Sequence, residues 1–489
     1  MLKTYLFPIL LSIGFCVGLG FWDYLSALKD APLFFVLVIS STFFLIAIKQ
    51  FKGRWIKSVF LILFLFLCAY ISSGTGFLQG HMSLGIIASM FQSNSNEAFE
   101  FLSVVDSQYI IFAVLLFLAT FFYIFFFDTT TQGNYRKLIL ALILLVNGIS
   151  IFWIQTALAT VKYKQEEAKL LEDNTQRVDW KIQSVQPQYD NQIIIIGESV
   201  QRDHMSLYGA KEETTPFLSK MPLQVVDHYI ATAPNTVTSL TRTLALVDKN
   251  RDPQIAMNVV TLAKQAGYNT MWISNQGFMG KNDTAISKIA IHADHQFFLK
   301  SGNYMSSNID DDQMVDILET QLKKYPNQKN VIFIHMMGSH PDACERLFES
   351  PRLYAAKPER INCYLSSINK LDRFVEKIYT NLKADQRSFS INYFSDHGMT
   401  VDEDSYHVDN EFKDNYQVPF FVLTSDAKAK NDYAKTVSAY DYMNIFAGLL
   451  GVKTPLLDQN RNLDQIPDNQ NVMVFDWDDY IPYHSLKGQ

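Results

Sequence analysis

Five apolar runs in the first third of the chain constrain its fold more than any other feature. They lie near residues 4–22, 33–49, 58–77, 109–127 and 137–157. Each run is about 20 residues long, which is enough for a helix to cross the hydrocarbon core of a bilayer. The remaining sequence has the polar mixture of a water-soluble protein. We therefore expect a transmembrane domain with five spans over 1–157, a linker or interfacial helix over 158–189, and a soluble domain over 190–489.

The loops between these runs differ in their basic residues, and this difference predicts a topology. The loops after the second and fourth runs are basic, whereas 23–32 holds one lysine and 78–108 holds none. The basic positions are Lys49, Lys52, Arg54, Lys57, Arg136 and Lys137. The positive-inside rule places both basic loops and the amino terminus in the cytoplasm, so the soluble domain lies outside. A cleaved signal peptide is the competing interpretation of residues 1–20, but no A-x-A cleavage pattern follows.

Charge and cysteine content narrow the possible partners and the compartment. The formal net charge is −7, and no block of Lys or Arg is present, so we expect no nucleic-acid partner. Cys344 and Cys363 are the two cysteines of the predicted exported part. An oxidising compartment would let them form a disulfide, although the sequence alone does not prove the bond.

The soluble part alternates between strand-length apolar runs and helical patterns. The expected strands are the isoleucine run at 193–196 and the runs at 268–274, 329–335, 389–394 and 418–424. The expected helices are 253–266, 310–324, 362–383 and 437–450. Such alternation predicts an α/β domain with a largely parallel sheet sandwiched by helices.

Polar clusters follow four of the strands, where ligands bind in parallel α/β sheets. They contain Glu198, then Asn275 and Gln276, then "HMMGSH" (335–340), and finally "SDHG" (395–398), with His407 further on. Glu198, Asp396, His397, His340 and His407 offer the carboxylates and imidazoles that zinc or a similar divalent ion prefers. Any one of these carboxylates alone would more often be a helix cap or a surface charge. His335 is as well explained by a core histidine as by a ligand.

A nucleophile for such a site is available in the hydroxyl-rich segment 230–246. Either Asn235 or Thr236 is the N-cap of the helix expected to follow. A hydroxyl at that position lies at the positive end of the helix dipole, which also favours a bound phosphate. A neighbouring metal ion would lower the pKa of the hydroxyl and activate it for attack. A simple capping role is compatible with the same position.

Taken together, these stretches resemble the phosphoethanolamine transferases of bacterial envelopes, membrane-anchored members of the alkaline phosphatase and sulfatase superfamily. The resemblance rests on "IIIIGESVQRDHMSLYGAKEETTPFL" (193–218), "APNTVTSLTRTL" (233–244), "HMMGSHP" (335–341) and "SDHG" followed by His407. It implies a sulfatase-like periplasmic catalytic domain anchored in the bacterial inner membrane by several spans.

The resemblance also assigns roles to residues. It makes Glu198, Thr236, Asp396 and His397 the ligands of one zinc ion, and leaves a second ion during turnover open. Thr236 is the implied nucleophile, with Ser239 three residues later in the Thr-x-x-Ser arrangement of the family. His340 and His407 are implied to hold the transferred phosphate or a second zinc. The other residues implied to bind the substrate are Ser239, Asn275, Gln276 and Glu97. His340 and His407 could also protonate a leaving group, and Glu97 could pair with an ethanolamine ammonium or be a solvated loop charge.

The implied reaction is transfer of phosphoethanolamine from phosphatidylethanolamine, through a covalent intermediate on Thr236, to an envelope glycolipid such as lipid A or the lipopolysaccharide core. The lipid bilayer holds both substrates. Family members that act on lipid A carry cysteines flanking the nucleophile, whereas this chain has Ala233 and Arg242, which leaves the acceptor open. The alternatives are a phosphoglycerol transferase on the same scaffold and a non-catalytic envelope scaffold or sensor. A sulfatase is disfavoured because "NTVTSLTR" lacks the cysteine and proline of the usual modification motif.

Overall fold

The computed structural model divides the chain into two compact units, and the boundary between them along the chain lies between Gln165 and Glu166. Each unit is described by itself. The structure describes residues 2–22, 31–49, 53–78, 80–92, 105–127, 146–173, 178–276, 285–300 and 308–488.

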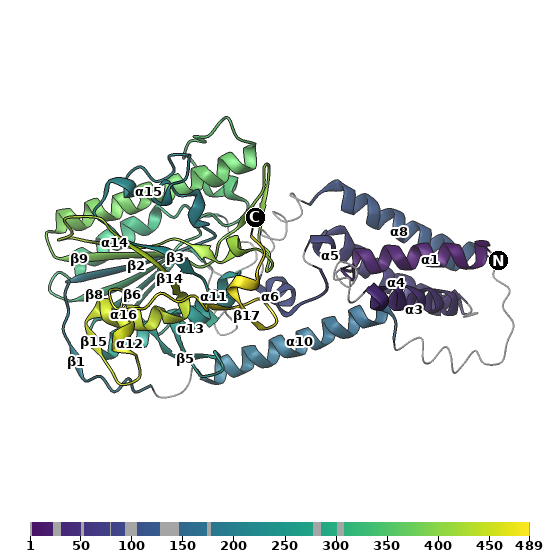
Figure 1. Cartoon of the computed structure of the whole chain (residues 1–489), viewed down its shortest axis with the longest axis horizontal. Coiled ribbons are helices and arrows are strands. Elements are labelled where there is room, and N and C mark those ends of the chain that lie inside the picture. Colours follow the sequence, from purple (N-terminus) through teal and green to yellow (C-terminus); the bar gives the residue numbers. More distant parts are fainter. Residues whose placement is uncertain are drawn as a thin grey trace. The chain divides into compact units, whose positions relative to one another are not determined.

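The first unit is helical (Figure 1). Its helices are α1 (Leu2–Gly18), α3 (Ala31–Lys49), α4 (Arg54–Ser72), α5 (Thr75–Leu78), α6 (Leu84–Gln92), α8 (Ser107–Phe126) and the first part of α10 (Gly148–Asp173). Within the described residues, α3, α4 and α8 are long and apolar enough to cross a membrane, and Tyr5–Gly18 is a shorter apolar helix. The predicted run 137–157 lies partly outside the described residues. Its described end belongs to α10, which continues through the segment expected as a linker as far as Asp173.

Apolar side chains face outward on these helices, as expected of a surface that meets lipid. Phe35 of α3, Phe66 of α4 and Leu115 of α8 each expose more than half of their area. At the end of α8, the Lys49 ammonium donates to the Tyr123 carbonyl oxygen at 2.8 Å. A cation at this position stabilises the negative end of the helix dipole.

The second unit is built on a nine-stranded sheet with the order β12-β3-β13-β9-β2-β8-β6-β7, and β14 also pairs with β3. The strands are β2 (Asn191–Gly197), β3 (Gln224–Ile230), β6 (Asn269–Ser274), β7 (His295–Phe298), β8 (Asn330–His335), β9 (Phe389–Ser395), β12 (Gln417–Val418), β13 (Phe420–Thr424) and β14 (Asn431–Ser438). The strands from β9 to β7 are parallel, but β13 is antiparallel to both of its neighbours. The sheet is therefore mixed: its part from β9 to β7 is parallel, and β14 is parallel to β3, whereas the antiparallel β12 and β13 depart from the expectation of a largely parallel sheet.

Helices cover both faces of this sheet, and the isoleucine run of β2 explains how. Successive side chains of a strand point to opposite faces, so Ile194 and Ile196 enter one hydrophobic core and Ile193 and Ile195 enter the other. The first core contains α12 (Val259–Gln265), α13 (Ala285–Ala290) and α16 (Tyr442–Leu450), and the second contains α14 (Gln313–Lys324) and α15 (Glu359–Asp385) (Figure 1). The α/β domain with its sheet between helices is thus confirmed.

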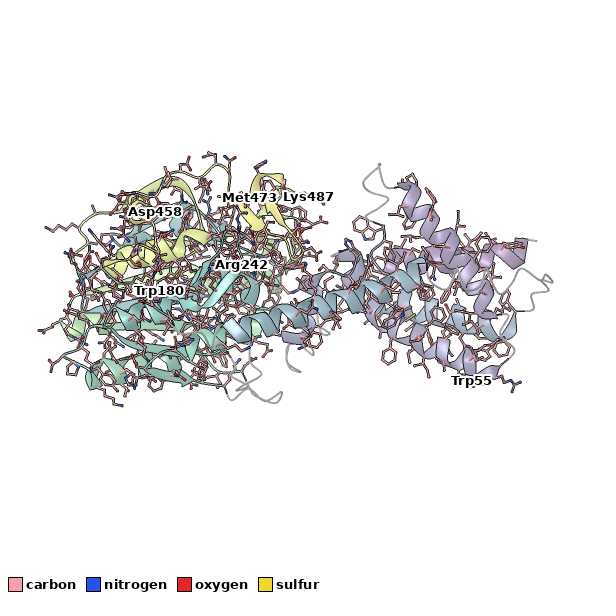
Figure 2. The ribbon with its side chains drawn as sticks, turned by 90° about the horizontal axis from the view of Figure 1, so that it is seen from below. Trp55, Trp180, Arg242, Asp458, Met473 and Lys487 are labelled. Atoms are coloured by element: carbon pink, nitrogen blue, oxygen red, sulfur yellow. A yellow bond between two sulfur atoms is a disulfide. The ribbon has the colours of Figure 1, made fainter. Side chains whose placement is uncertain are left out.

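Two expected helices are preceded by strand residues that the sequence pattern assigned to the helix. Residues 253–258 form the strand β5 (Pro253–Asn258), which pairs with β4 (Ala245–Val247), and only then does α12 start. Asn258 and Thr261 form a capping box that fixes this start. On α12, Thr261 also accepts the indole N–H of the buried Trp180 at 3.1 Å. Figure 2 shows Trp180 among the side chains of the second unit. Residues 437–438 likewise end β14, and α16 begins at Tyr442.

Candidate metal centre and catalytic site

The register of β2 against β9 brings two carboxylates together. Gly197 lies opposite Ser395 on the neighbouring parallel strand, so the next residues, Glu198 and Asp396, leave the sheet side by side. Both are 1% exposed. Ser199 then adopts a left-handed conformation with φ of 60°, which is rare outside glycine and turns the chain away behind Glu198.

Glu198, Asp396 and His397 form a buried triad whose potential ligand atoms all lie within 4.8 Å of one another. His397 Nε2 is 3.4 Å from Glu198 Oε1 and 3.5 Å from Asp396 Oδ2. The predicted convergence of these three residues is therefore seen in the structure.

The hydrogen bonds around the triad leave one carboxylate oxygen without a partner and orient an imidazole nitrogen toward Glu198. Asp396 Oδ1 accepts the backbone N–H groups of Ser199 and His397, but the buried Asp396 Oδ2 has no hydrogen-bond partner. His397 Nδ1 is 2.7 Å from the Gly398 carbonyl oxygen and donates to it, which leaves Nε2 facing the two carboxylates. Glu198 is the third group: its Oε1 accepts the Ser199 hydroxyl at 2.6 Å, and its Oε2 accepts the Thr236 hydroxyl at 3.1 Å. An orphaned buried oxygen beside an oriented imidazole fits a bound divalent metal ion.

The pKa shifts within the triad also fit a bound divalent metal ion. Burial, followed by the neighbouring Glu198, raises the pKa of Asp396 to about 6. Burial lowers the pKa of His397, but the carboxylates of Asp396 and Glu198 outweigh it and raise the pKa to about 9. Two buried carboxylates thus compete for positive charge, which a dication supplies without protonation.

Thr236 is the first residue of α11 (Thr236–Leu244), and its hydroxyl points at the triad. Thr236 Oγ1 donates to Glu198 Oε2 at 3.1 Å. The N-cap is Asn235, whose side chain accepts the Thr238 N–H at 3.1 Å, so the Thr236 hydroxyl is not used for capping. Ser239 is buried and donates to the Asp396 carbonyl oxygen at 2.6 Å. It joins the first turn of α11 to the triad through the backbone.

The residues that follow β6 and β8 have different surroundings. Gln276 Nε2 donates to the Met336 carbonyl oxygen at 2.8 Å and lies 3.5 Å from Glu198 Oε2, so Gln276 borders the triad. Asn275 instead donates to Asp311 Oδ1 at 2.8 Å. His335 is buried against Trp272, with the ring centroids 6.0 Å apart, and burial lowers its pKa to about 4. A neutral, buried His335 fits the core interpretation.

His340 lies in the loop after β8, and His407 lies in the hairpin of β10 (Thr400–Val401) and β11 (Tyr406–His407), which follows Asp396 and His397 in the chain. His340 follows Ser339, whose N–H donates to the Glu198 carbonyl oxygen at 3.0 Å. His407 ends β11 and lies 3.4 Å from Asp409 Oδ2. A hydrogen bond to Asp409 raises the pKa of His407. Glu97, the predicted headgroup contact, lies outside the described residues.

Asp311 is a buried residue of the site that sequence reasoning missed. It accepts the N–H groups of Met337 at 3.0 Å and Gly338 at 2.8 Å, besides the Asn275 amide. These bonds hold the loop after β8 against Glu198. Gly338 has φ of 49°, and a Cβ there would lie 3.0 Å from the Glu198 carbonyl oxygen. Nothing in the run Asp310-Asp311-Asp312 signals that the middle residue is the buried one.

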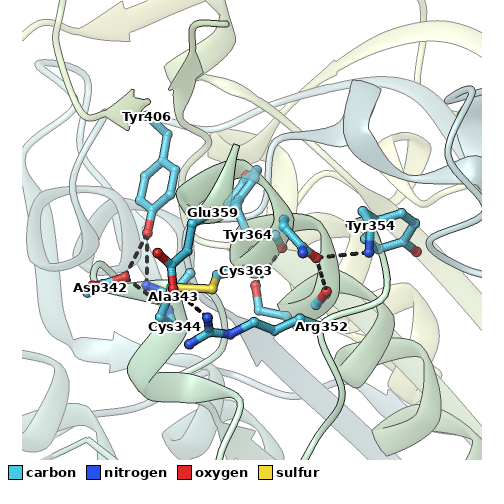
Figure 3. The surroundings of a disulfide bond; sticks show 12 residues. Asp342, Ala343, Cys344, Arg352, Tyr354, Glu359, Cys363, Tyr364 and Tyr406 are labelled. Atoms are coloured by element: carbon cyan, nitrogen blue, oxygen red, sulfur yellow. Dashed lines mark hydrogen bonds and ion pairs between the residues drawn. A yellow bond between two sulfur atoms is a disulfide. The ribbon is translucent and has the colours of Figure 1, made fainter. Parts of the chain in front are cut away.

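Cys344 and Cys363 are bonded to each other, with their Cα atoms 4.9 Å apart (Figure 3). Cys344 lies in the short helix η5 (Ala343–Arg346), a few residues after His340, and Cys363 lies in the first turns of α15. The bond therefore fastens the loop after β8 to α15.

Comparisons with known proteins agree with this arrangement. The sulfatase family profile matches residues 190–452. The phosphoethanolamine transferase OpgE of Escherichia coli is 36% identical over 295 residues, which cover 59% of this chain and 56% of OpgE. A Haemophilus influenzae protein named "Putative phosphoethanolamine transferase" is 33% identical over 347 residues, 68% of this chain and 71% of that protein. The chain thus spans little more than half the length of OpgE.

Two solved structures share the fold. The zinc complex of the carboxy-terminal periplasmic domain of Escherichia coli EptC superposes with a TM-score of 0.55 and 24% identity, covering 63% of this chain and 95% of that one. The integral membrane lipooligosaccharide phosphoethanolamine transferase EptA of Neisseria meningitidis has a TM-score of 0.61 and 15% identity, covering 93% and 97%. This chain is a member of the sulfatase family, in its phosphoethanolamine transferase branch.

Proposed function

We propose that this protein transfers phosphoethanolamine from phosphatidylethanolamine to an envelope glycolipid, either lipid A or the lipopolysaccharide core, in a zinc-dependent reaction. One observation carries the proposal: the Thr236 hydroxyl lies 3.1 Å from a carboxylate oxygen of the buried triad Glu198, Asp396 and His397. The names of its relatives support the choice of phosphoethanolamine as the transferred group.

Glu198, Asp396, His397 and Thr236 would hold the zinc ion, as the zinc-bound EptC domain of the same fold suggests. When bound, zinc lowers the pKa of a hydroxyl and neutralises charge on phosphoryl oxygens. The number of ions, one or a second during turnover, belongs to the proposal.

The chain's own residues would perform two displacements. In the first, Thr236 Oγ1 forms a bond to phosphorus while the bond from phosphorus to the diacylglycerol oxygen breaks. The Thr236 proton leaves toward Glu198, to which it already donates, and the diacylglycerol oxygen takes a proton from His340 or His407. In the second, an acceptor hydroxyl bonds to phosphorus and loses its proton to the same histidine, while the bond from phosphorus to Thr236 Oγ1 breaks and Thr236 takes its proton back from Glu198.

The membrane unit would place this chemistry at the outer surface of the bacterial inner membrane. We propose five crossings with a cytoplasmic amino terminus, as the basic loops predict, which leaves the catalytic domain in the periplasm. Donor and acceptor lipids would then both reach the site from one bilayer surface. Glu97 would pair with the ethanolamine ammonium of the donor.

The test uses the full chain in detergent micelles with phosphatidylethanolamine labelled in its headgroup. Thr236→Ala should lower label transfer by about 10³-fold or more and abolish a phosphoethanolamine adduct in intact mass spectra. Thr238→Ala, the same change two residues along α11, is the matched control and should retain transfer. Removal of zinc with a chelator should stop transfer, and added zinc should restore it.

Three results would contradict the proposal. Full transfer by Thr236→Ala would reject this nucleophile. Label accepted only from phosphatidylglycerol would favour the phosphoglycerol alternative. A wild-type chain that folds and binds zinc but forms neither adduct nor product would favour a non-catalytic role.

A further inference from the structure

Two buried tyrosines connect the loops that carry the site residues. Tyr364 lies on α15 directly after Cys363, and Tyr406 lies on β11 directly before His407. Tyr364 is 0% and Tyr406 is 2% exposed, and their ring centroids are 5.1 Å apart. Each hydroxyl is hydrogen-bonded to a different loop of the site.

The Tyr364 hydroxyl holds the turn behind Glu198. It donates to the Ser199 carbonyl oxygen at 2.9 Å and accepts the Gln201 N–H at 2.9 Å. Ser199 is the left-handed residue that follows Glu198; its N–H donates to Asp396 Oδ1 at 2.9 Å and its hydroxyl to Glu198 Oε1 at 2.6 Å. A residue in this conformation costs free energy and persists only where its surroundings fix it. Tyr364 supplies two of the bonds that do so.

The Tyr406 hydroxyl holds the segment that follows His340. It accepts the Ala343 N–H at 2.9 Å and lies 3.3 Å from Asp342 Oδ1, to which it donates (Figure 3). The same Asp342 oxygen accepts the Cys344 N–H at 2.9 Å. Tyr406 thus joins the hairpin that bears His407 to the loop that bears His340.

The disulfide closes this set of contacts. Cys344 lies next to Ala343, and Cys363 lies next to Tyr364, so the covalent bond joins the two ends of the path that runs from Tyr364 through Tyr406 to Ala343. One helical turn beyond Cys363, the Ser367 hydroxyl donates to Ser339 Oγ at 2.8 Å. The first turns of α15 therefore contact the loops after β2 and β8, and reach the β11 hairpin through the contact between the Tyr364 and Tyr406 rings.

We propose that Tyr364 and Tyr406 are positioning residues for the transfer reaction. Tyr364 fixes Glu198 for metal binding, and Tyr406 fixes His340 and His407 relative to each other for phosphate binding and proton transfer. The roles given to the two histidines rest on the proposed function. The role of Tyr364 rests only on the triad geometry.

The experiment replaces each tyrosine by phenylalanine, which keeps the contact between the rings and removes the hydroxyl. Tyr354→Phe is the matched control, because its hydroxyl also donates to a backbone oxygen, that of Glu213 at 3.0 Å, beside the same disulfide. Thermal unfolding, zinc affinity by competition with a chelating dye, kcat and KM are measured on the full chain in detergent.

Tyr364→Phe removes the hydrogen bonds that hold the turn behind Glu198. It should weaken zinc binding about tenfold, since losing a hydrogen bond that orients a metal ligand has an effect of this size. Tyr406→Phe should leave zinc affinity unchanged and lower kcat about tenfold, with KM changed less than twofold, and should shift the pH profile of kcat because the histidines move. Tyr354→Phe should match wild type in zinc affinity and kcat.

The two proposals fail in distinguishable ways. If the wild-type chain shows no transfer, the proposed function fails, but the zinc affinity of Tyr364→Phe still tests the positioning of Glu198. If transfer occurs and both variants equal Tyr354→Phe in every measurement, the positioning proposal is overturned. A lower unfolding temperature with unchanged zinc affinity, kcat and pH profile would show that the tyrosines serve only stability, and would overturn it as well.

Discussion

Replacing Asp311 by alanine should loosen the loop that supports Glu198. Asp311 is 8% exposed and accepts three hydrogen bonds, from the Asn275 amide and from the N–H groups of Met337 and Gly338. The variant leaves all three donors without this acceptor. An unsatisfied buried donor costs about 1–3 kcal/mol.

We take the low end of this range because the substitution also removes a buried charge. Burial raises the pKa of Asp311, which shows that its ionised form is penalised in the folded protein. Three donors at about 1 kcal/mol each give about 3 kcal/mol, or roughly a hundredfold rise in the population of the open loop. The effect is local, because the bonds belong to one loop.

Hydrogen exchange measured by mass spectrometry on the full chain in detergent provides the assay. Peptides that cover residues 336–346 should exchange about a hundredfold faster in Asp311→Ala, and zinc affinity should fall with them. Asp312→Ala is the control: its carboxylate pairs with Lys377 at 2.6 Å on the exposed surface, and such pairs contribute little. Equal exchange in the two variants would refute the supporting role of Asp311.

Two further predictions concern the stability of the soluble domain. The double variant Cys344→Ala, Cys363→Ala should lose roughly 3 kcal/mol of unfolding free energy, as expected for a disulfide between residues 19 apart. Chemical reduction of the wild type should lower the unfolding temperature as much as the double substitution does. If neither treatment changes stability, the bond is not a stabilising one. Burial raises the pKa of Asp372 from 3.8 to about 6, so between these values the folded state binds the proton more tightly and the free energy of unfolding falls as pH rises. Asp372→Asn should make this fall smaller, by on the order of 2 kcal/mol between pH 4 and pH 7. Denaturant titrations that give the same pH dependence for the variant and the wild type would contradict the assignment.

The centre of the fold and the triad could be predicted because simple local rules agree there. Four consecutive isoleucines require burial on both faces of a strand, and the structure divides them between two cores. The carboxyl ends of neighbouring parallel strands then bring Glu198 and Asp396 together without further information.

Other features depend on contacts that the sequence does not display. The run 418–424 has the composition of a central strand, but strand direction follows from the chain's path, and β13 is antiparallel. Residues 253–258 fit a helical pattern until the pairing of β5 with β4 is known. Asp311 has the same side chain as both of its neighbours, so only the donors of the loop after β8 single it out.

The bond from Ser239 to the Asp396 carbonyl oxygen has a mechanical consequence. It links the start of α11 to the end of β9, so we expect the Thr236 hydroxyl, the proposed attacking group, to shift together with Asp396 when the sheet fluctuates. Motions that admit a substrate or release a product are then expected in the surrounding loops rather than between these two elements.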